Sequence, residues 1–197
     1  MTLKVALVGP SRGGKTRIAA QLADMQIYDD SEYEPTAGVR IFEFEEKINA
    51  VSNDERQNKK VKCQVELWDL SGNTEDNAEK NLWPAVVSDL NGAMVVFDPT
   101  SKQQANDVRL WCEWFCKHGD LQTGQCVIFA HGALTSRHKP LSVKVGDDRT
   151  VSVPIVNVNY QLSYEKDGET ISVPSGAKAE FQKFLGKVWG FHKDASF

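Results

Sequence analysis

The chain has 197 residues and a formal net charge of −4. This length suits one domain that buries a hydrophobic core without disulfides or structural metals, so we expect residues 1–197 to form a single domain. The acidic balance gives no reason to expect a nucleic acid or an anionic membrane surface as a partner.

The first predicted element is a buried strand that leads into a glycine-rich loop. The apolar residues 5–8 are followed at positions 9–16 by Gly-Pro-Ser-Arg-Gly-Gly-Lys-Thr, which has the pattern G-x-x-x-x-G-K-T, and residues 16–23 then show helical spacing. In this context the loop N–H groups and the helix dipole favour bound phosphate oxygens. We expect Lys15 to bridge the outer phosphates of a nucleotide and Thr16 to offer its hydroxyl to Mg²⁺.

Around this loop the nucleotide contacts are expected from consecutive residues. They are Ser11, Arg12, Gly13, Gly14, Lys15, Thr16 and Arg17. Two roles stay open for Arg12, an N–H donor to the phosphates or a side chain that faces solvent, and we favour the second.

A hairpin is predicted after the polar connection at residues 29–32 and the Tyr-Glu-Pro-Thr-Ala-Gly segment at 33–38. Residues 39–44 and 62–68 both alternate apolar and polar side chains, which is the period of half-exposed strands. The polar residues 49–60 between them predict a long solvated loop.

Five later stretches have the pattern of buried elements. Apolar runs predict strands at 93–97, 126–130 and 153–158, and helical spacing predicts helices at 105–117 and 177–188. Residues 136–150 are polar and predict an irregular insertion. The apolar helix faces carry Val108, Trp111, Cys112 and Phe115, and Phe181, Phe184, Leu185 and Val188. Apolar strands separated by helices predict an α/β fold, with a mostly parallel central sheet covered on both faces.

The four cysteines lie in apolar or amphipathic stretches, and the chain opens without a signal-peptide pattern. We therefore expect reduced, buried thiols in a cytosolic compartment. Cys112 and Cys116 lack a second ligand pair at zinc spacing, so both are expected in the core. The second residue is threonine and the last residues hold no cysteine, so no lipid anchor is expected.

Two further motifs narrow the choice among an ATPase, a nucleotide kinase and a GTPase, which the loop alone leaves open. Thr36 is placed to bring its hydroxyl to Mg²⁺ and to a γ-phosphate. Asp69-x-x-Gly72 follows a predicted core strand, where Asp69 would hold the water shell of the metal and Gly72 would offer its N–H to the same phosphate.

Together, these motifs resemble those of small GTPases of the Ras superfamily. The resemblance implies a phosphate-loop small G domain with an antiparallel hairpin strand in its sheet, which binds GTP or GDP and Mg²⁺. It also implies that the nucleotide site includes Tyr33, Thr36, Gly72 and His131, and that the metal is held by Thr16, Thr36 and, through water, Asp69.

The sequence departs from this superfamily at the positions that bind the guanine base and at the position that orients the attacking water. Ala130-His131-Gly132-Ala133-Leu134 stands where the family has Asn-Lys-x-Asp, and residues 158–160 replace its Ser-Ala-Lys. Leu134 cannot accept the hydrogen bonds of guanine, which would weaken binding roughly ten- to a hundred-fold. Asn73 stands where a hydrolysing member has glutamine, so we expect very slow GTP hydrolysis.

A closer resemblance covers about the first 130 residues. The segments 33–44, 65–69, 83–85 and 95–97, with Ile-Phe-Ala-His at 128–131, are similar to those of the Rab-like small GTPase subunits of intraflagellar transport complex B. This resemblance implies a protein of the cytoplasm, the cilium or flagellum and its base, whose nucleotide state affects docking on coiled-coil subunits of the complex. Exposed aromatic residues such as Trp83 would be natural anchors for a partner helix. Two alternatives stay open, a hydrolysing GTPase timer and a structural subunit with a permanently bound nucleotide.

Overall fold

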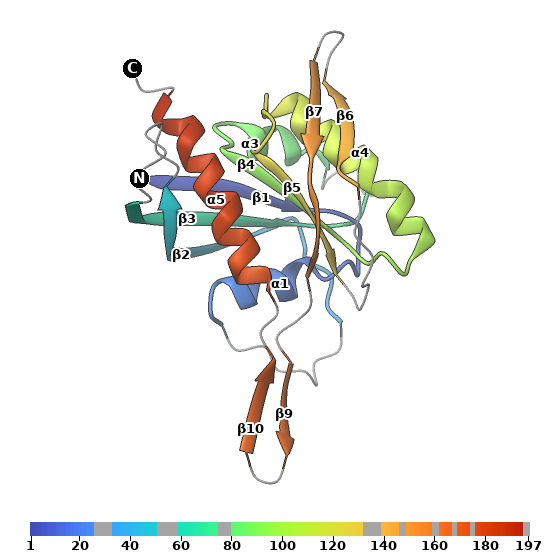
Figure 1. Ribbon diagram of the computed structural model, residues 1–197. Coiled ribbons are helices and arrows are strands. Elements are labelled where there is room, and N and C mark those ends of the chain that lie inside the picture. The colour runs from blue at the N-terminus through green and yellow to red at the C-terminus, as the bar shows by residue number, and fades with distance from the viewer. Residues whose placement is uncertain are drawn as a thin grey trace.

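The computed structural model describes residues 1–25, 33–50, 59–74, 80–131, 139–145, 149–158, 162–166, 169–173 and 176–194 (Figure 1). Its helices are α1 (Lys15–Leu22), α3 (Trp83–Val87), α4 (Lys102–His118) and α5 (Ala177–Asp194). Its strands are β1 (Thr2–Val8), β2 (Val39–Ala50), β3 (Lys59–Leu70), β4 (Gly92–Phe97), β5 (Cys126–His131), β6 (Leu141–Val145), β7 (Arg149–Val153), β8 (Ile155–Val158), β9 (Leu162–Lys166) and β10 (Glu169–Val173).

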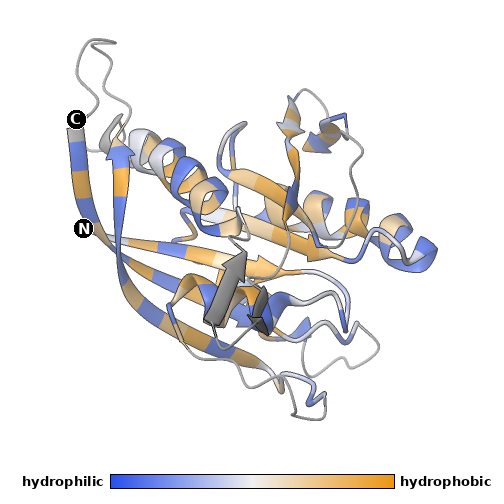
Figure 2. Ribbon diagram, turned by 60° about the horizontal axis from the view of Figure 1, so that its bottom comes forward, coloured by the Kyte–Doolittle hydropathy of each residue, from blue (hydrophilic) through white to orange (hydrophobic). Residues whose placement is uncertain are grey.

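The central sheet has the strand order β2-β3-β1-β4-β5-β8. All neighbouring pairs are parallel except β2 with β3, which form the predicted antiparallel hairpin. β4 is buried at every position, as a strand covered on both faces requires, whereas the long strand β2 carries many exposed polar residues. Figure 2 shows this alternation of hydrophilic and hydrophobic residues along the long strands. The parallel order brings the carboxyl ends of β1, β3, β4 and β5 to one edge of the sheet, where ligands bind in such folds.

Helices cover both faces of the sheet, which confirms the predicted α/β architecture (Figure 1). On one face, α1 and α5 bury Ile18, Phe181 and Leu185 against β1, β3 and β5. On the other face, α3 and α4 bury Val86 and Phe115. All the apolar residues predicted to face inward from the two long helices are buried.

Residues 136–150 were expected to form an irregular polar insertion, and this prediction is wrong. The described part contains β6 and β7, which pair antiparallel from Leu141 opposite Val153 to Val145 opposite Arg149. Every second side chain is apolar and buried, namely Val143, Val145, Val151 and Val153, and these residues join the core beside α4. The polar residues between them face outward, which is why the segment reads as polar in sequence.

Two other predicted boundaries differ from the structure. The strand expected at 153–158 is split at Pro154, because β7 ends the β6–β7 hairpin and β8 enters the central sheet beside β5. The loop expected at 49–60 is shorter, because β2 continues to Ala50 and β3 begins at Lys59, opposite Ala50. Ala50 is buried, so packing extends the hairpin beyond its most apolar part.

A third hairpin, β9–β10, was not expected from the sequence. Within the described part of the chain its strands pair only with each other, and Figure 1 shows this ribbon projecting from the body of the molecule beyond α1. It lies in the chain between β8 and α5, so it leaves the sheet from the edge at which the carboxyl ends of the parallel strands gather.

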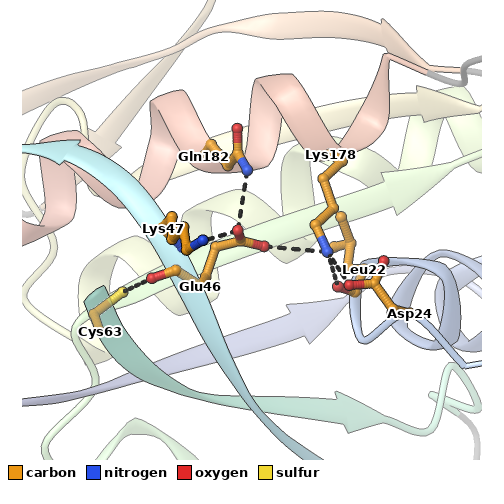
Figure 3. Close-up of polar contacts among 7 residues, drawn as sticks. All are labelled: Leu22, Asp24, Glu46, Lys47, Cys63, Lys178 and Gln182. Atoms are coloured by element: carbon orange, nitrogen blue, oxygen red, sulfur yellow. Dashed lines mark hydrogen bonds and ion pairs between the residues drawn. The ribbon is translucent and has the colours of Figure 1, made fainter. Parts of the chain in front are cut away.

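A polar cluster joins α1, β2 and α5 within the apolar layer (Figure 3). Glu46 on β2 is only 5% exposed, and its Oε1 accepts hydrogen bonds from the backbone N–H of Lys47 and from Nε2 of Gln182. Nζ of Lys178 lies 3.4 Å from the other carboxylate oxygen of Glu46, 2.6 Å from Asp24, and donates to the carbonyl of Leu22. The cluster therefore fastens the end of α1 to both the sheet and α5.

All four cysteines are free and buried, as the sequence predicts. Burial raises the pKa of the Cys63 thiol to about 11, so this thiol is protonated at neutral pH. Within the described ranges, no group of three or more His, Cys, Asp or Glu residues could hold a metal ion. No helix in the described part of the chain combines the length and apolar composition needed to cross a membrane.

Candidate functional site

The glycine-rich loop lies between β1 and α1 and packs closely on the end of β4. Gly9 has a φ of 134°, and a Cβ atom there would lie 2.2 Å from the carbonyl oxygen of Val96. Gly14 has a φ of 91° and is the N-cap residue of α1. Only glycine fits such positions, so the loop requires the first and last glycines of the G-x-x-x-x-G-K-T motif for steric reasons.

Lys15 is buried against this loop with 6% exposure. Its Nζ donates hydrogen bonds to the carbonyl oxygens of Gly9 and Pro10, at 2.9 and 3.0 Å. A buried ammonium needs nearby oxygen acceptors and a compensating negative charge, and nucleotide phosphates supply both.

Three separate segments meet at Asp69, the last but one residue of β3. The hydroxyl of Thr16, in the first turn of α1, donates to Oδ2 of Asp69 at 2.7 Å. The hydroxyl of Thr36, which precedes β2, lies 3.0 Å from that of Thr16 and 3.3 Å from the same carboxylate oxygen. The structure thus brings together the three residues that the sequence assigns to the metal.

Asp69 is fully buried, and burial raises the pKa of its carboxyl group. The hydrogen bonds from Thr16 and Thr36 and the charge of Lys15 act in the opposite direction but do not cancel this effect. Its second oxygen, Oδ1, is buried and has no hydrogen-bond partner among the described residues. A buried carboxylate oxygen without a partner, beside two hydroxyl groups, is a donor set that suits the hard cation Mg²⁺ and its bound water.

Gly72 brings the Asp-x-x-Gly motif against the phosphate loop. A Cβ atom at Gly72 would lie 2.3 Å from the backbone nitrogen of Ser11 and 2.6 Å from Nζ of Lys15. The adjacent Ser71 donates its N–H to the carbonyl of Gly38, which ties the motif to the residue before β2. Asn73 is exposed beside them, and its N–H donates to the hydroxyl of Ser71.

Arg12 is exposed, as expected, but its side chain does not simply extend into solvent. The Cζ atom of its guanidinium lies 4.5 Å from the centre of the Tyr33 ring. The backbone N–H of Arg12 also donates to the hydroxyl of Tyr33 at 3.3 Å. Tyr33 is therefore near the loop, as the sequence suggests, and its described contacts are with Arg12.

His131 lies where the guanine base is expected to bind. It is the last residue of β5 and is half-buried. Burial lowers the pKa of its imidazole, and the positive charge of Arg17 acts in the same direction, whereas Asp98 opposes it. The neutral imidazole is therefore favoured at pH 7. The other residues of the altered base motif, at 132–134, and those at 159–160 lie outside the described residues.

Gln104 on α4 is a contact of the phosphate loop that sequence reasoning missed. Its Nε2 donates to the carbonyl of Ser11 at 3.1 Å, and its Oε1 accepts from the backbone N–H of Asp98 at 2.8 Å. One side chain thereby bridges the loop and the end of β4. No motif marks this residue, because the contact depends on how α4 packs.

Trp83 was expected to be an exposed anchor for a partner, and the structure corrects this. It is half-buried, and its ring lies 4.9 Å from that of Trp111, 4.8 Å from that of Trp114 and 5.5 Å from that of Phe115. Trp83 therefore holds α3 against α4. The exposed apolar side chains near the site are instead Tyr33, Ile41 and Leu82.

The fold and this arrangement define a Ras-like small GTPase domain: a phosphate loop after β1, a threonine before β2 and an Asp-x-x-Gly motif at the end of β3. Residues 4–132 match the family model described as Roc, Ras of Complex, domain of DAPkinase. The chain is 36% identical over 186 residues to the intraflagellar transport protein 22 homolog of Danio rerio, covering 94% of this chain and 89% of the relative. It is 34% identical over 188 residues to the Homo sapiens homolog, with the same coverages. The chain thus belongs to the intraflagellar transport protein 22 family, a family of Ras-like GTPases.

Solved structures share the fold. The GTP-bound crystal structure of IFT22/74/81 from T. brucei contains a chain with a TM-score of 0.63 and 21% identity, covering 100% of this chain and 99% of that one. The GTP-bound crystal structure of T. brucei IFT22 has a TM-score of 0.55 at 22% identity, covering 98% of this chain and 99% of that one. The resemblance to Rab-like GTPases of intraflagellar transport is confirmed by the family model and by the Danio rerio and Homo sapiens relatives.

Proposed function

We propose that this protein is a guanine-nucleotide-binding subunit of intraflagellar transport complex B whose nucleotide state controls its docking on other subunits. The observation that carries the proposal is the meeting of Thr16, Thr36 and Asp69 from three segments, with Gly72 against the phosphate loop. Segments that converge in this way can respond together to the third phosphate of GTP.

In this proposal the protein supplies the phosphate site from the backbone of residues 11–17 and the ammonium of Lys15. Thr16 and Thr36 would hold Mg²⁺ directly, and Asp69 would hold it through water. When bound, the metal would neutralise the charge of the outer phosphates. The buried Oδ1 of Asp69, which accepts no hydrogen bond from the described residues, supports this assignment, because a metal-bound water would donate one to it.

The partners we propose are coiled-coil subunits of the complex, since the T. brucei relative was crystallised as IFT22/74/81. The family name supports a place in the cytoplasm, at the base of the cilium or flagellum and within it. Recruitment to the complex would depend on these partners. The surface that responds to nucleotide would include the exposed Tyr33, Ile41 and Leu82.

A hydrolysing timer is the second candidate, and Asn73 argues against unaided turnover. Its side chain is one methylene shorter than the glutamine that orients the attacking water in hydrolysing relatives. A partner could still complete the site with an arginine. We therefore propose very slow intrinsic hydrolysis, so that partner binding and not turnover is the main output of the nucleotide.

The test combines two measurements on the purified protein. Chromatography of nucleotides released on denaturation is expected to show GDP or GTP, and titration is expected to show tighter guanine-nucleotide binding with Mg²⁺ than with a chelator. Pull-downs with counterparts of subunits 74 and 81 are then compared with GDP, with a non-hydrolysable GTP analogue and without nucleotide. Equal capture in all three would leave a structural, permanently bound nucleotide as the better account, and no binding of guanine nucleotide at all would refute the proposal.

A further inference from the structure

One contact across the site joins the phosphate loop to the segment before β2. The guanidinium of Arg12 lies over the ring of Tyr33, with 4.5 Å from Cζ to the ring centre, and the Arg12 N–H donates to the Tyr33 hydroxyl at 3.3 Å. A cation over an aromatic face within about 6 Å of its centre is attracted by the ring. The phosphate loop and the segment before β2 are therefore linked through these two residues.

We infer that Arg12 is a positioning residue: by holding Tyr33 against the phosphate loop, it slows the release of any nucleotide bound there. This inference rests on the nucleotide binding proposed above and adds a regulatory property to the same site. The side chain of Arg12 acts through Tyr33 and not through a bond to phosphate, whereas the backbone of residues 11–17 remains the proposed phosphate site.

The geometry of the neighbouring contact supports this role. Three residues after Tyr33, the hydroxyl of Thr36 lies 3.0 Å from that of Thr16. The segment is thus fastened at two points, by Tyr33 to the loop and by Thr36 to the first turn of α1. The phosphate loop, the start of α1 and the segment 33–38 surround the proposed phosphate site. A nucleotide could therefore leave this site only if the segment moved.

The contact with Tyr33 leads to a specific expectation for the release rates of GDP and GTP. Because the guanidinium of Arg12 contacts the ring of Tyr33, Arg12 should slow release of both nucleotides by the same factor. An arginine that instead paired with the third phosphate would slow release of GTP alone. The two cases differ also in their dependence on Tyr33, which only the positioning role requires.

The experiment measures dissociation of fluorescent GDP and of a fluorescent, non-hydrolysable GTP analogue by stopped flow. It compares the wild type with Arg12→Ala, Tyr33→Leu and the double variant. Alanine keeps the backbone N–H and is restricted like arginine at the φ of 62° found at residue 12, so the substitution removes the side chain alone. Lys102→Ala is the matched control, because Lys102 is an exposed cation in the first turn of α4.

Arg12→Ala is expected to speed release of both nucleotides roughly two- to five-fold, as loss of an exposed cation–π contact implies. Tyr33→Leu should have an effect at least as large, and adding Arg12→Ala to it should change nothing more. Lys102→Ala should release both nucleotides at the wild-type rate.

Two results would overturn the inference while leaving the proposed function intact. One is wild-type release of both nucleotides from Arg12→Ala. The other is faster release of the GTP analogue alone, by the same factor with or without Tyr33, which would place Arg12 on the phosphate. Failure of the wild-type protein to bind either nucleotide would instead refute the proposed function, and the inference with it. Circular dichroism of each variant checks that folding is unchanged.

Discussion

Lys178 on α5 lies 3.4 Å from the buried carboxylate of Glu46 on β2, and it is the basic group that the described structure pairs with that carboxylate. Glu46 is almost fully buried, so its charge depends on this neighbour and on the hydrogen bonds from Lys47 and Gln182. Removing one partner of such a pair leaves an uncompensated charge in the interior, which costs more than the pair itself contributes.

Lys178→Met should therefore lower the free energy of unfolding by about 2 kcal/mol or more. Urea denaturation followed by circular dichroism measures the change. Glu46→Gln introduced into Lys178→Met should recover part of the loss, since the unpaired charge is then gone. The matched control is Lys183→Met, because Lys183 pairs with Glu180 at the surface and should cost less than about 1 kcal/mol. Equal losses for the two lysines would show that burial of Glu46 does not matter.

Asp69 should make the free energy of unfolding decrease as the pH rises, which is opposite to the usual effect of carboxyl groups that stabilise the folded state only when ionised. Burial raises the pKa of its carboxyl group in the folded protein above the ordinary value of 3.8. The folded protein then binds more protons than the unfolded chain between these two values, so this residue reduces stability as pH rises through its raised pKa. The cost is complete above the raised pKa and absent below the ordinary value.

Asp69→Asn should consequently stabilise the nucleotide-free protein at pH 7, and this gain should shrink as the pH falls through the raised pKa. The same variant should bind GTP less tightly in the presence of Mg²⁺, because the carboxylate that would hold the metal's water is lost. Urea unfolding at several pH values, with nucleotide titration beside it, measures both effects. A destabilised variant at pH 7 would contradict the first expectation.

Gly72→Ala tests the close approach of the Asp-x-x-Gly motif to the phosphate loop. The new Cβ would meet the nitrogen of Ser11 at 2.3 Å, so the motif must move away from the loop. Affinity for a GTP analogue should fall roughly ten-fold, whereas affinity for GDP should change less, because Gly72 is expected to serve the third phosphate. Gly190→Ala is the control, since a Cβ atom at that position would have no neighbouring atom within 4 Å. Calorimetric titration with both nucleotides provides the comparison, and equal losses for GDP and GTP would count against the assigned role.

Asn73→Gln tests the expected slowness of GTP hydrolysis. Asn73 is exposed directly after Gly72, and glutamine would extend the amide by one methylene toward the attacking water. Single-turnover phosphate release should rise by about ten-fold or more over a very slow wild-type rate. Fast hydrolysis by the wild type would show that Asn73 is not limiting.

The elements that the sequence predicted well are those whose signals are local. The phosphate loop is defined by its own glycines, and the central strands by short, continuous apolar runs bounded by turns. The β2–β3 hairpin follows from alternation along each strand. These features need no knowledge of distant residues, and all appear in the structure near the predicted positions.

The missed features depend on packing between distant parts of the chain. Strands β6 and β7 have only five residues each, which is too short for their alternating valines to indicate strands from the sequence. The valines are buried because they pack beside α4, a helix distant in the sequence. Trp83 is withdrawn from solvent by Trp111 and Trp114, which lie on another helix. The contact of Arg12 with Tyr33 spans 21 residues, and no spacing rule connects them.

In the parallel register of β1 and β3, Leu7 lies opposite Asp69, just before the phosphate loop begins at Gly9. Backbone hydrogen bonds of the sheet, rather than the connecting segments, thus determine how far the loop stands from the carboxylate. Insertions and deletions in the connection between β2 and β3, to which no site residue is assigned, should consequently leave that spacing unchanged. A deep mutational scan would then find this connection permissive and the paired residues of β1 and β3 intolerant.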